Sequence, residues 1–152
     1  LTKTDDPKEK SELLRHIVVV GAYLKRRNNL ILVNEQDGVI KEEELNLSIQ
    51  EMIKNLQLAG IHCAGTVEFE INLPTDVAMK LFDFYEYVVE NAFDGLGSLL
   101  ARFFFRDNSF YACIDAVCSL DLTKLQNEQI FVSVSDKNCY TLSLKIEGGD
   151  GR

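Results

Sequence analysis

The sequence predicts an α+β fold: a two-layer α/β sandwich in which a mixed sheet carries helices on one face. Two observations predict it. In the first part of the chain, apolar residues recur at a helical spacing. After a single long helix come several runs that have the alternation or the β-branched content of strands. Strands that succeed one another after a helix are typical of α+β architecture. The 152 residues are enough for one domain with a sizeable core.

The N-terminal residues are the hardest to interpret. Residues 1–10 are charged and lack periodicity, so we expect a frayed start or the end of a linker. Residues 11–34 fit a helical stripe, although their β-branched residues also suit a β-hairpin, and we favour the helix. We therefore assign residues 1–40 to an extra N-terminal helical segment that serves as a connector or for dimerisation. Because the chain begins with Leu1 and not Met, we expect it to be a piece of a longer protein.

Residues 41–59 form the clearest predicted helix. Three glutamates occupy its first turn, where the helix dipole favours negative charge, and Gly60 supplies a stop at its end. Its buried face should comprise Leu45, Ile49, Met52, Ile53 and Leu56. Residues 66–73 then alternate between apolar and polar types, which predicts a half-buried strand.

A second helix opens at the sequence Pro74-Thr75-Asp76, with Thr75 as its expected N-cap. Its apolar stripe consists of Val77, Leu81, Phe84 and Val88. Gly95 and Gly97 should end it. The remaining elements form two predicted hairpins with a short helix or loop between them. We expect strands at 99–106 and 109–117, the short element at 120–125, strands at 129–135 and 140–146, and a flexible tail at 148–152.

Composition excludes several classes of protein. The formal net charge of −8 argues against a general nucleic-acid binder, which needs a basic surface. No run of about 18 apolar residues and no signal peptide is visible, so we expect no direct membrane contact. The four cysteines form no CxxC pair, which argues against a zinc site, and we expect two of them, Cys113 and Cys139, to be buried thiols. We expect a reduced, cytoplasmic protein.

The long helix carries an acidic line made of Asp83, Glu86, Glu90 and Asp94, at spacings of three and four residues. Asn91 lies beside this line. Carboxylate and amide oxygens together suit a hard cation such as Mg²⁺. The alternative is a solvated acidic face with Asn91 at its edge, which spacing alone favours.

The stretch "YVVENA", residues 87–92, resembles the N-box of the GHKL ATPase superfamily in the form used by two-component sensor histidine kinases. The stretch "LQLAGI", residues 56–61, is similar to the end of the first helix of such a domain, and the order of elements agrees. The resemblance covers residues 41–147, and it implies a histidine-kinase ATPase (Bergerat) fold there.

The resemblance also implies a site. Asn91 would bind Mg²⁺ and bridge it to the phosphates of ATP, and Glu90 would be the catalytic residue that holds the metal or polarises a water. Asp115 would bind the adenine amino group, in the place of the aspartate of the family's D-x-G-x-G pattern. ATP and Mg²⁺ would be the cofactors, phosphoryl transfer to a histidine the reaction, and a second copy and a response regulator the partners.

Several departures from the family pattern predict weak or absent ATP binding. Val117 and Ser119 replace the two glycines of D-x-G-x-G, and we expect Val117 to obstruct the approach of the backbone to a ligand. No long ATP lid follows, and Asp94 stands where the family has a basic residue. His16 lacks the acidic neighbour of a phosphoacceptor, so we expect a structural or surface role for it. The alternative functions are a regulatory, dimerisation or scaffold domain that kept the fold and binds no ATP, and an unrelated α+β interaction module.

Overall fold

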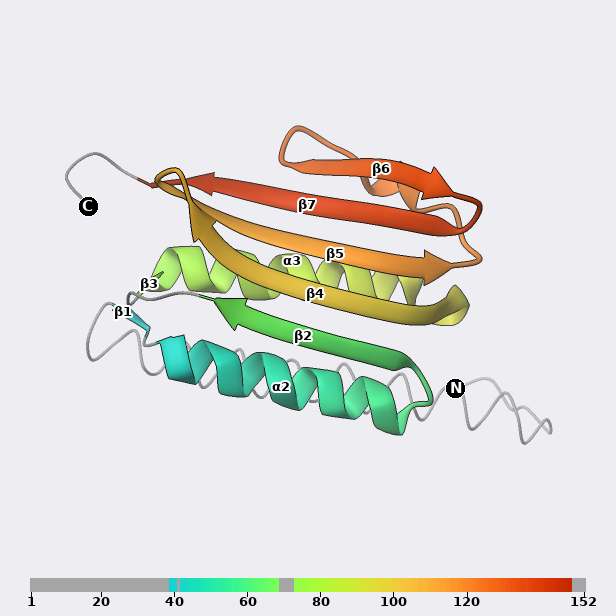
Figure 1. The fold of residues 1–152 in the computed structure, drawn as a ribbon, viewed down its shortest axis with the longest axis horizontal. Coiled ribbons are helices and arrows are strands. Elements are labelled where there is room, and N and C mark those ends of the chain that lie inside the picture. The colour runs from blue at the N-terminus through green and yellow to red at the C-terminus, as the bar shows by residue number, and fades with distance from the viewer. Residues whose placement is uncertain (1–38, 41, 69–72, 149–152) are drawn as a thin grey trace, which may run out of the picture.

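The computed structural model describes residues 39–40, 42–68 and 73–148. The predicted N-terminal helix and most of the C-terminal tail lie outside the described residues. The elements are β1 (Val39–Ile40), α2 (Glu42–Leu58), β2 (His62–Glu68), β3 (Leu73–Pro74), α3 (Thr75–Ala92), η1 (Phe93–Gly95), β4 (Leu96–Arg106), β5 (Ser109–Cys118), η2 (Leu122–Leu125), β6 (Ile130–Asp136) and β7 (Cys139–Glu147) (Figure 1). None of the helices in these described ranges is both long enough and apolar enough to cross a membrane.

The main sheet has five strands in the order β2-β4-β5-β7-β6. β2 runs parallel to β4, and every other neighbouring pair is antiparallel, so the sheet is mixed as predicted. β1 and β3 form a separate two-stranded antiparallel pair. The α+β class and the two predicted hairpins are therefore confirmed.

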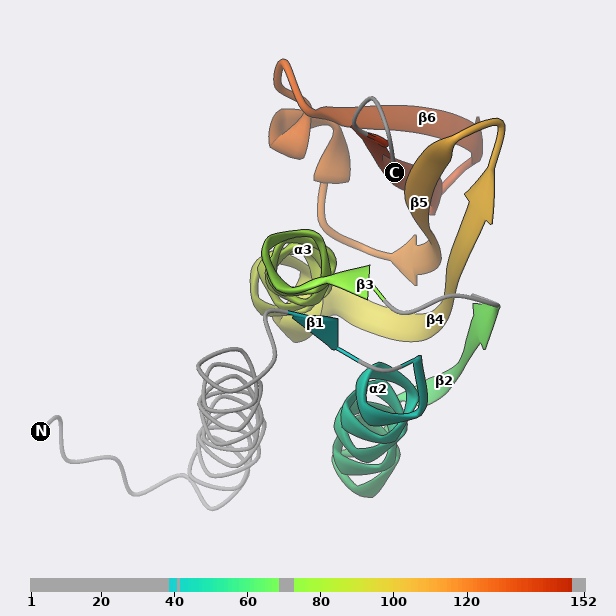
Figure 2. The ribbon, with the colours of Figure 1, turned by 90° about the vertical axis from the view of Figure 1, so that its left-hand side faces the viewer.

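Both described helices lie on the same concave side of the curved sheet, as Figure 2 shows. α2 packs on β2 so closely that a Cβ at Gly65 would overlap the side chain of Ile53. The face predicted for α2 is entirely buried, since its five residues are 0–3% exposed: Leu45, Ile49, Met52, Ile53 and Leu56. The prediction of helices on one face of the sheet is confirmed.

α3 packs across β4, β5 and β7 and buries its predicted apolar stripe. The helix begins one residue earlier than expected, so the N-cap is Pro74, which has no side-chain acceptor. Thr75 is the first helical residue, and its hydroxyl is buried without a hydrogen-bond partner. The prediction that Thr75 caps this helix is wrong.

Strand limits differ from the prediction on the N-terminal side of α3. The strand expected at 66–73 begins at His62, because β2 pairs in parallel with β4 from His62↔Ser98 onward, and Leu73 belongs to β3 instead. The β4–β5 hairpin closes through Asp107 and Asn108, which have φ angles of 51° and 62°. Two successive residues with positive φ are typical of the tight turns that match the twist of a hairpin.

Candidate functional site

Glu90 and Asn91, the residues predicted to hold a metal and a phosphate, lie in the last turn of α3 with exposed side chains. The Asn91 amide bonds to its own helix, because its Nδ2 donates to the carbonyl oxygen of Tyr87 at 2.7 Å. A bond from residue i to the carbonyl of residue i−4 satisfies the amide locally and requires no ligand. The catalytic role of Glu90 and the Mg²⁺ and ATP contacts of Asn91 stay predictions.

Asp115, the predicted adenine-binding residue, lies on the sheet face that points away from α3. Its neighbours in β5, Ile114 and Ala116, are buried on the side of the helices. Because successive side chains of a strand point to opposite faces, the Asp115 carboxylate points the other way. The structure therefore does not bring Asp115 together with Glu90 and Asn91.

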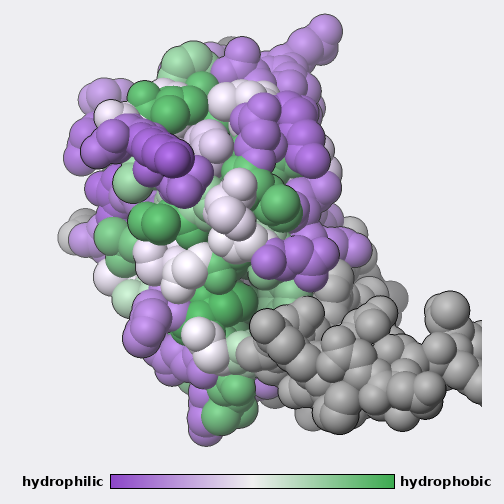
Figure 3. All heavy atoms as spheres, turned by 90° about the vertical axis from the view of Figure 1, so that its right-hand side faces the viewer, coloured by the Kyte–Doolittle hydropathy of each residue, from purple (hydrophilic) through white to green (hydrophobic). Residues whose placement is uncertain are grey.

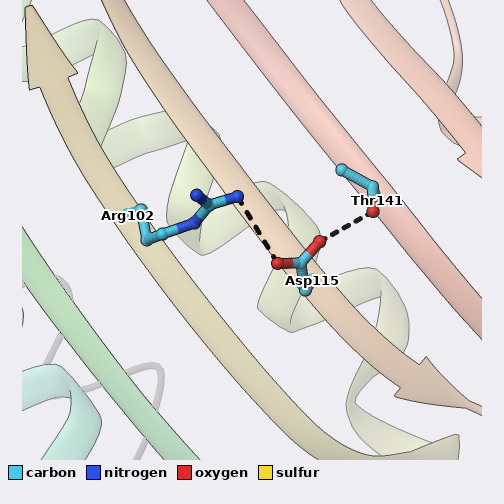
Figure 4. Close-up of polar contacts among 3 residues, drawn as sticks. All are labelled: Arg102, Asp115 and Thr141. Atoms are coloured by element: carbon cyan, nitrogen blue, oxygen red, sulfur yellow. Dashed lines mark hydrogen bonds and ion pairs between the residues drawn. The ribbon is translucent and has the colours of Figure 1, made fainter.

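Two side chains of the neighbouring strands engage the Asp115 carboxylate on this outer face, in front of the sheet when α3 lies behind it (Figure 4). Thr141 Oγ1 in β7 donates to Asp115 Oδ1 at 2.7 Å, and Arg102 Nη2 in β4 lies 3.6 Å from Asp115 Oδ2. The two charged side chains are 45% and 42% exposed, so the ion pair contributes at most about 1 kcal/mol. Asp115 already has partners within the sheet.

The chain that follows β5 packs directly against the end of α3. The buried Cys118 Sγ lies 3.5 Å from the carbonyl oxygen of Ala92, the last residue of α3. Burial raises the pKa of the Cys118 thiol, so it stays protonated and can donate this hydrogen bond. Ser119 N donates to Gly95 O at 2.9 Å. A Cβ at Gly95 would lie 2.5 Å from Ser119 Oγ and 2.8 Å from Leu120 Cγ, so this glycine permits the close packing.

The short helix η2 completes this arrangement. Leu122 and Leu125 are 0% and 4% exposed, and η2 contacts both α3 and β6. Asp121 caps η2: its carboxylate accepts from Thr123 N at 3.0 Å and from Thr123 Oγ1 at 2.5 Å. We call the packing of residues 118–125 against residues 92–95 and the adjoining part of α3 the closed end of α3.

Val117, which we expected to obstruct the approach of the backbone to a ligand, does not lie at the closed end. Its side chain is 45% exposed, because it shares the outer face of β5 with Asp115. Cys118, Leu122 and Leu125 are the buried side chains that residues 118–125 contribute to the closed end. The alternation of the sequence contains this signal, since Ala116 and Cys118 are two residues apart and Val117 stands between them.

Glu86 is a residue whose environment the sequence did not reveal. It is only 4% exposed, and neither oxygen of its carboxylate has a hydrogen-bond partner. Burial first, and then the negative charges of Glu90 and Asp83, raise the pKa of Glu86 to about 8, so this side chain is mostly protonated at neutral pH. The acidic line of α3 is therefore not a uniformly solvated face.

Within the part of the chain that the structure describes, no three side chains of the His, Cys, Asp or Glu type lie close enough to hold a metal ion. All four cysteines are free thiols. Cys113 and Cys139 are half-buried, contrary to the expectation that they are fully buried, because both lie on the outer face of the sheet.

Comparison with known proteins gives information on the fold alone. No protein-family model and no curated protein matches the chain. The Acinetobacter baumannii histidine kinase AdeS has a similar structure, with 12% identity and a TM-score of 0.51 over 98% of this chain and 88% of that chain. The Erythrobacter litoralis EL346 blue-light activated histidine kinase gives 12% identity and a TM-score of 0.55 over 85% of this chain and 55% of that chain.

A third similar structure is described as a bacterial phosphotransferase. It is 11% identical and gives a TM-score of 0.50 over 94% of this chain and 98% of that chain. The chain thus has the fold of histidine kinases, and the predicted resemblance is confirmed at the level of the fold. The division at residues 40 and 147 and the roles of the site residues stay predictions.

Proposed function

We propose that this chain is the histidine-kinase-fold domain of a two-component signalling protein, and that it works through a protein partner and not as an ATP-dependent kinase. The similarity to the histidine kinases supports the signalling context. In that context we expect a cytoplasmic domain, a second copy in a homodimer, and a response regulator as the downstream partner.

The closed end of α3 is the observation that carries this proposal. The resemblance implies a nucleotide pocket between the helix that carries Asn91 and the sheet. In this chain Cys118 and Leu122 are buried there, and Asp115 lies on the other face of the sheet. A nucleotide would have to displace these buried side chains, and it would gain no carboxylate for its adenine.

The surface over this end is also a poor match for a triphosphate. Figure 3 looks onto the end of the molecule where α3 and β5 finish, and apolar side chains gather in its middle between hydrophilic margins. Phosphates require cations or backbone N–H groups directed at them. Asp94, exposed just after α3, would repel a phosphate group.

Calorimetric titration of the chain with ATP, with and without Mg²⁺, tests the proposal. We expect no saturable heat at millimolar ATP from the folded chain. Asn91→Ala and Asp115→Ala are the matched variants, and they should behave as the wild type. Saturable binding that requires Mg²⁺ and disappears in Asn91→Ala would overturn the proposal in favour of an active ATP-binding domain.

Histidyl phosphotransfer is the second candidate function. The observation that favours it is the similarity to the bacterial phosphotransferase, which extends over nearly the whole of both chains. Phosphotransfer needs a histidine and a partner domain but no nucleotide pocket, so it is compatible with a closed end. The chain has two histidines: His62, which is exposed at the start of β2, and His16, which lies outside the described residues.

Incubation of the chain with a small phosphoryl donor such as phosphoramidate, followed by detection of phosphohistidine, tests this second candidate. Phosphorylation that His16→Ala abolishes and His62→Ala leaves intact would identify the acceptor. Phosphorylation absent from wild type, or equal in both variants, would remove the candidate.

A further inference from the structure

A groove of about 470 Å³ lies between the middle of α3 and the final residues of β7. Phe84 and Tyr87 line it from α3, Leu144 and Ile146 from β7, and Ile130 from the start of β6. The volume lies in the range of ligand-binding pockets in proteins. This groove is separate from the closed end, which involves the opposite end of β5 and the last turn of α3.

The strand that borders the groove has a free edge. β6 pairs with β7 only as far as Ile130↔Leu144, whereas β7 continues to Glu147. Among the described strands, the residues from Lys145 to Glu147 therefore pair with β5 alone. Figure 1 shows β7 extending beyond the start of β6. A free strand edge presents N–H and C=O groups that can pair with another chain.

The occupant that fits this geometry is an extended peptide. A strand placed beside the end of β7 would continue the line of β6 and would turn alternate side chains toward Phe84 and Ile146. At about 3.3 Å per residue, three free residues of β7 can pair with about three residues of the peptide. A helix could not use the free backbone groups of the edge, because its own N–H and C=O groups bond within the helix.

The charges around the groove favour an uncharged peptide. Lys80 and Asp83 stand on the wall formed by α3, and Lys145 and Glu147 on the wall formed by β7. Each wall thus carries one positive and one negative side chain. The groove therefore has no net charge that would favour an anionic or a cationic peptide. The net charge of −8 disfavours a nucleic acid. Main-chain pairing and apolar contacts remain as the sources of recognition.

We propose that the end of β7 accepts an extended, uncharged segment of a partner protein as an added strand, with every second side chain placed in the groove against α3. Added-strand recognition takes its affinity from main-chain hydrogen bonds and its specificity from alternate side chains. The proposal does not depend on the absence of ATP binding, because the two sites lie at different ends of the molecule.

Amide NMR spectra of the ¹⁵N-labelled chain, titrated with the peptide acetyl-Thr-Val-Thr-Val-Thr-amide, test the proposal. We expect shift changes and slower hydrogen exchange centred on residues 145–147. The same peptide with proline in place of its central threonine lacks one N–H and resists strand pairing, so it should bind at least tenfold more weakly. Unchanged binding by the proline peptide would overturn the added-strand geometry.

Two exposed aromatic positions supply a matched pair of variants. Tyr87→Ala, at a residue that is 41% exposed and lines the groove, should weaken binding several-fold without unfolding the chain. Phe131→Ala, at a residue that is 63% exposed on the outer face of β6, should leave binding unchanged. No shift change at millimolar peptide, or changes centred away from β7, would overturn the proposal. Tighter binding by the same peptide with lysine or glutamate in place of its two terminal threonines would overturn the assignment to an uncharged segment.

Discussion

The last turn of α3 and the middle of the same helix differ in how closely the rest of the chain packs against them. At the C-terminal end, Cys118 and Leu122 pack against the helix, and Gly95 allows the following chain to come within contact distance. Farther toward the N-terminus, Phe84 and Tyr87 border a groove. The motif that resembles a nucleotide site lies at the closed end, whereas the open space lies elsewhere along the same helix.

This difference shows that residue types in a motif and the space around them are separate properties. Glu90 and Asn91 match the family pattern in identity and in position on a helix. Beside the last turn of the same helix, however, the short helix η2 and the buried thiol of Cys118 fill the space next to the sheet. A motif carried by one helix therefore predicts function only when the segments that pack against that helix are also considered.

The largest expected effect comes from breaking the closed end. Leu122→Ala removes a fully buried side chain beside α3, and we expect a loss of about 2–5 kcal/mol in the free energy of unfolding. Urea denaturation measures it. Leu58→Ala is the control, because Leu58 is 73% exposed and its truncation should cost little. Equal losses in the two variants would mean that η2 does not hold the end of α3 closed.

Glu86→Gln probes the part of α3 where the groove meets the closed end, and where Glu86 is buried while Glu90, one turn later, is exposed. In the folded chain the pKa of Glu86 is about 8, above its ordinary value of 4.5. Between these two pH values Glu86 is therefore protonated in the folded chain and ionised in the unfolded chain. Wild-type stability is therefore full below about pH 4.5 and falls as the pH rises to about 8. At about pH 9 we expect the variant to be more stable than wild type by about 2–4 kcal/mol.

Thermal unfolding across this pH range measures the effect of Glu86→Gln. Between the two pKa values, the free energy of unfolding of the variant should change much less with pH than that of the wild type. Glu90→Gln is the control, and it should keep most of the wild-type pH dependence because its side chain is exposed. A wild type whose stability does not change between about pH 5 and 9 would contradict a buried, unpaired carboxyl at this position.

Gly95→Ala tests the close approach at the closed end. The new Cβ would lie 3.1 Å from the backbone nitrogen of Leu120, and even closer to two side-chain atoms, so the segment after β5 must move. We expect a loss of about 1–3 kcal/mol. Gly97→Ala is the matched control, because its Cβ would meet only Val117 O, at an ordinary 3.6 Å. A similar small change in both variants would show that the contact at Gly95 is loose.

Asn91→Ala should have the smallest effect. The side chain is exposed and bonds only to its own helix in the contacts described here, so we expect a change in stability within about 0.5 kcal/mol. Asn55→Ala in α2 is matched to it, because Asn55 Nδ2 makes the same type of bond to Glu51 O at 2.9 Å. A much larger loss for Asn91→Ala than for Asn55→Ala would mark Asn91 as a structural residue of the closed end.

Local patterns predicted most of the described fold. The helical spacing of α2 can be read from residues that are close in sequence, and so can the hairpin predicted from the strands at 99–106 and 109–117. Both predictions agree with the structure. The start of β2 was missed, because its parallel partner β4 lies beyond α3 in the chain. The cap at Thr75 was wrong, because the start of α3 is shared with the small β1–β3 sheet, a contact that the sequence does not reveal.

The candidate site was less predictable. The side of the sheet occupied by Asp115 follows from the alternation in β5, which can be read from the sequence once the strand is placed. The burial of Glu86 cannot be read this way, because its spacing fits both the exposed acidic line and the apolar faces of α3. The groove beside β7 depends on where β6 starts relative to its partner, a register that only the assembled sheet defines.

The order of the strands has a consequence for how the domain folds and opens. β4 and β5 are joined by a two-residue turn, so the central hairpin can form from local contacts alone. β2 reaches its position beside β4 only after α3 has crossed the sheet, and it remains an edge strand. Contacts that close long loops form late and cost more entropy. We therefore expect β2 and α2 to detach together as the first unit to unfold, with amide hydrogens that exchange faster in β2 than in β5.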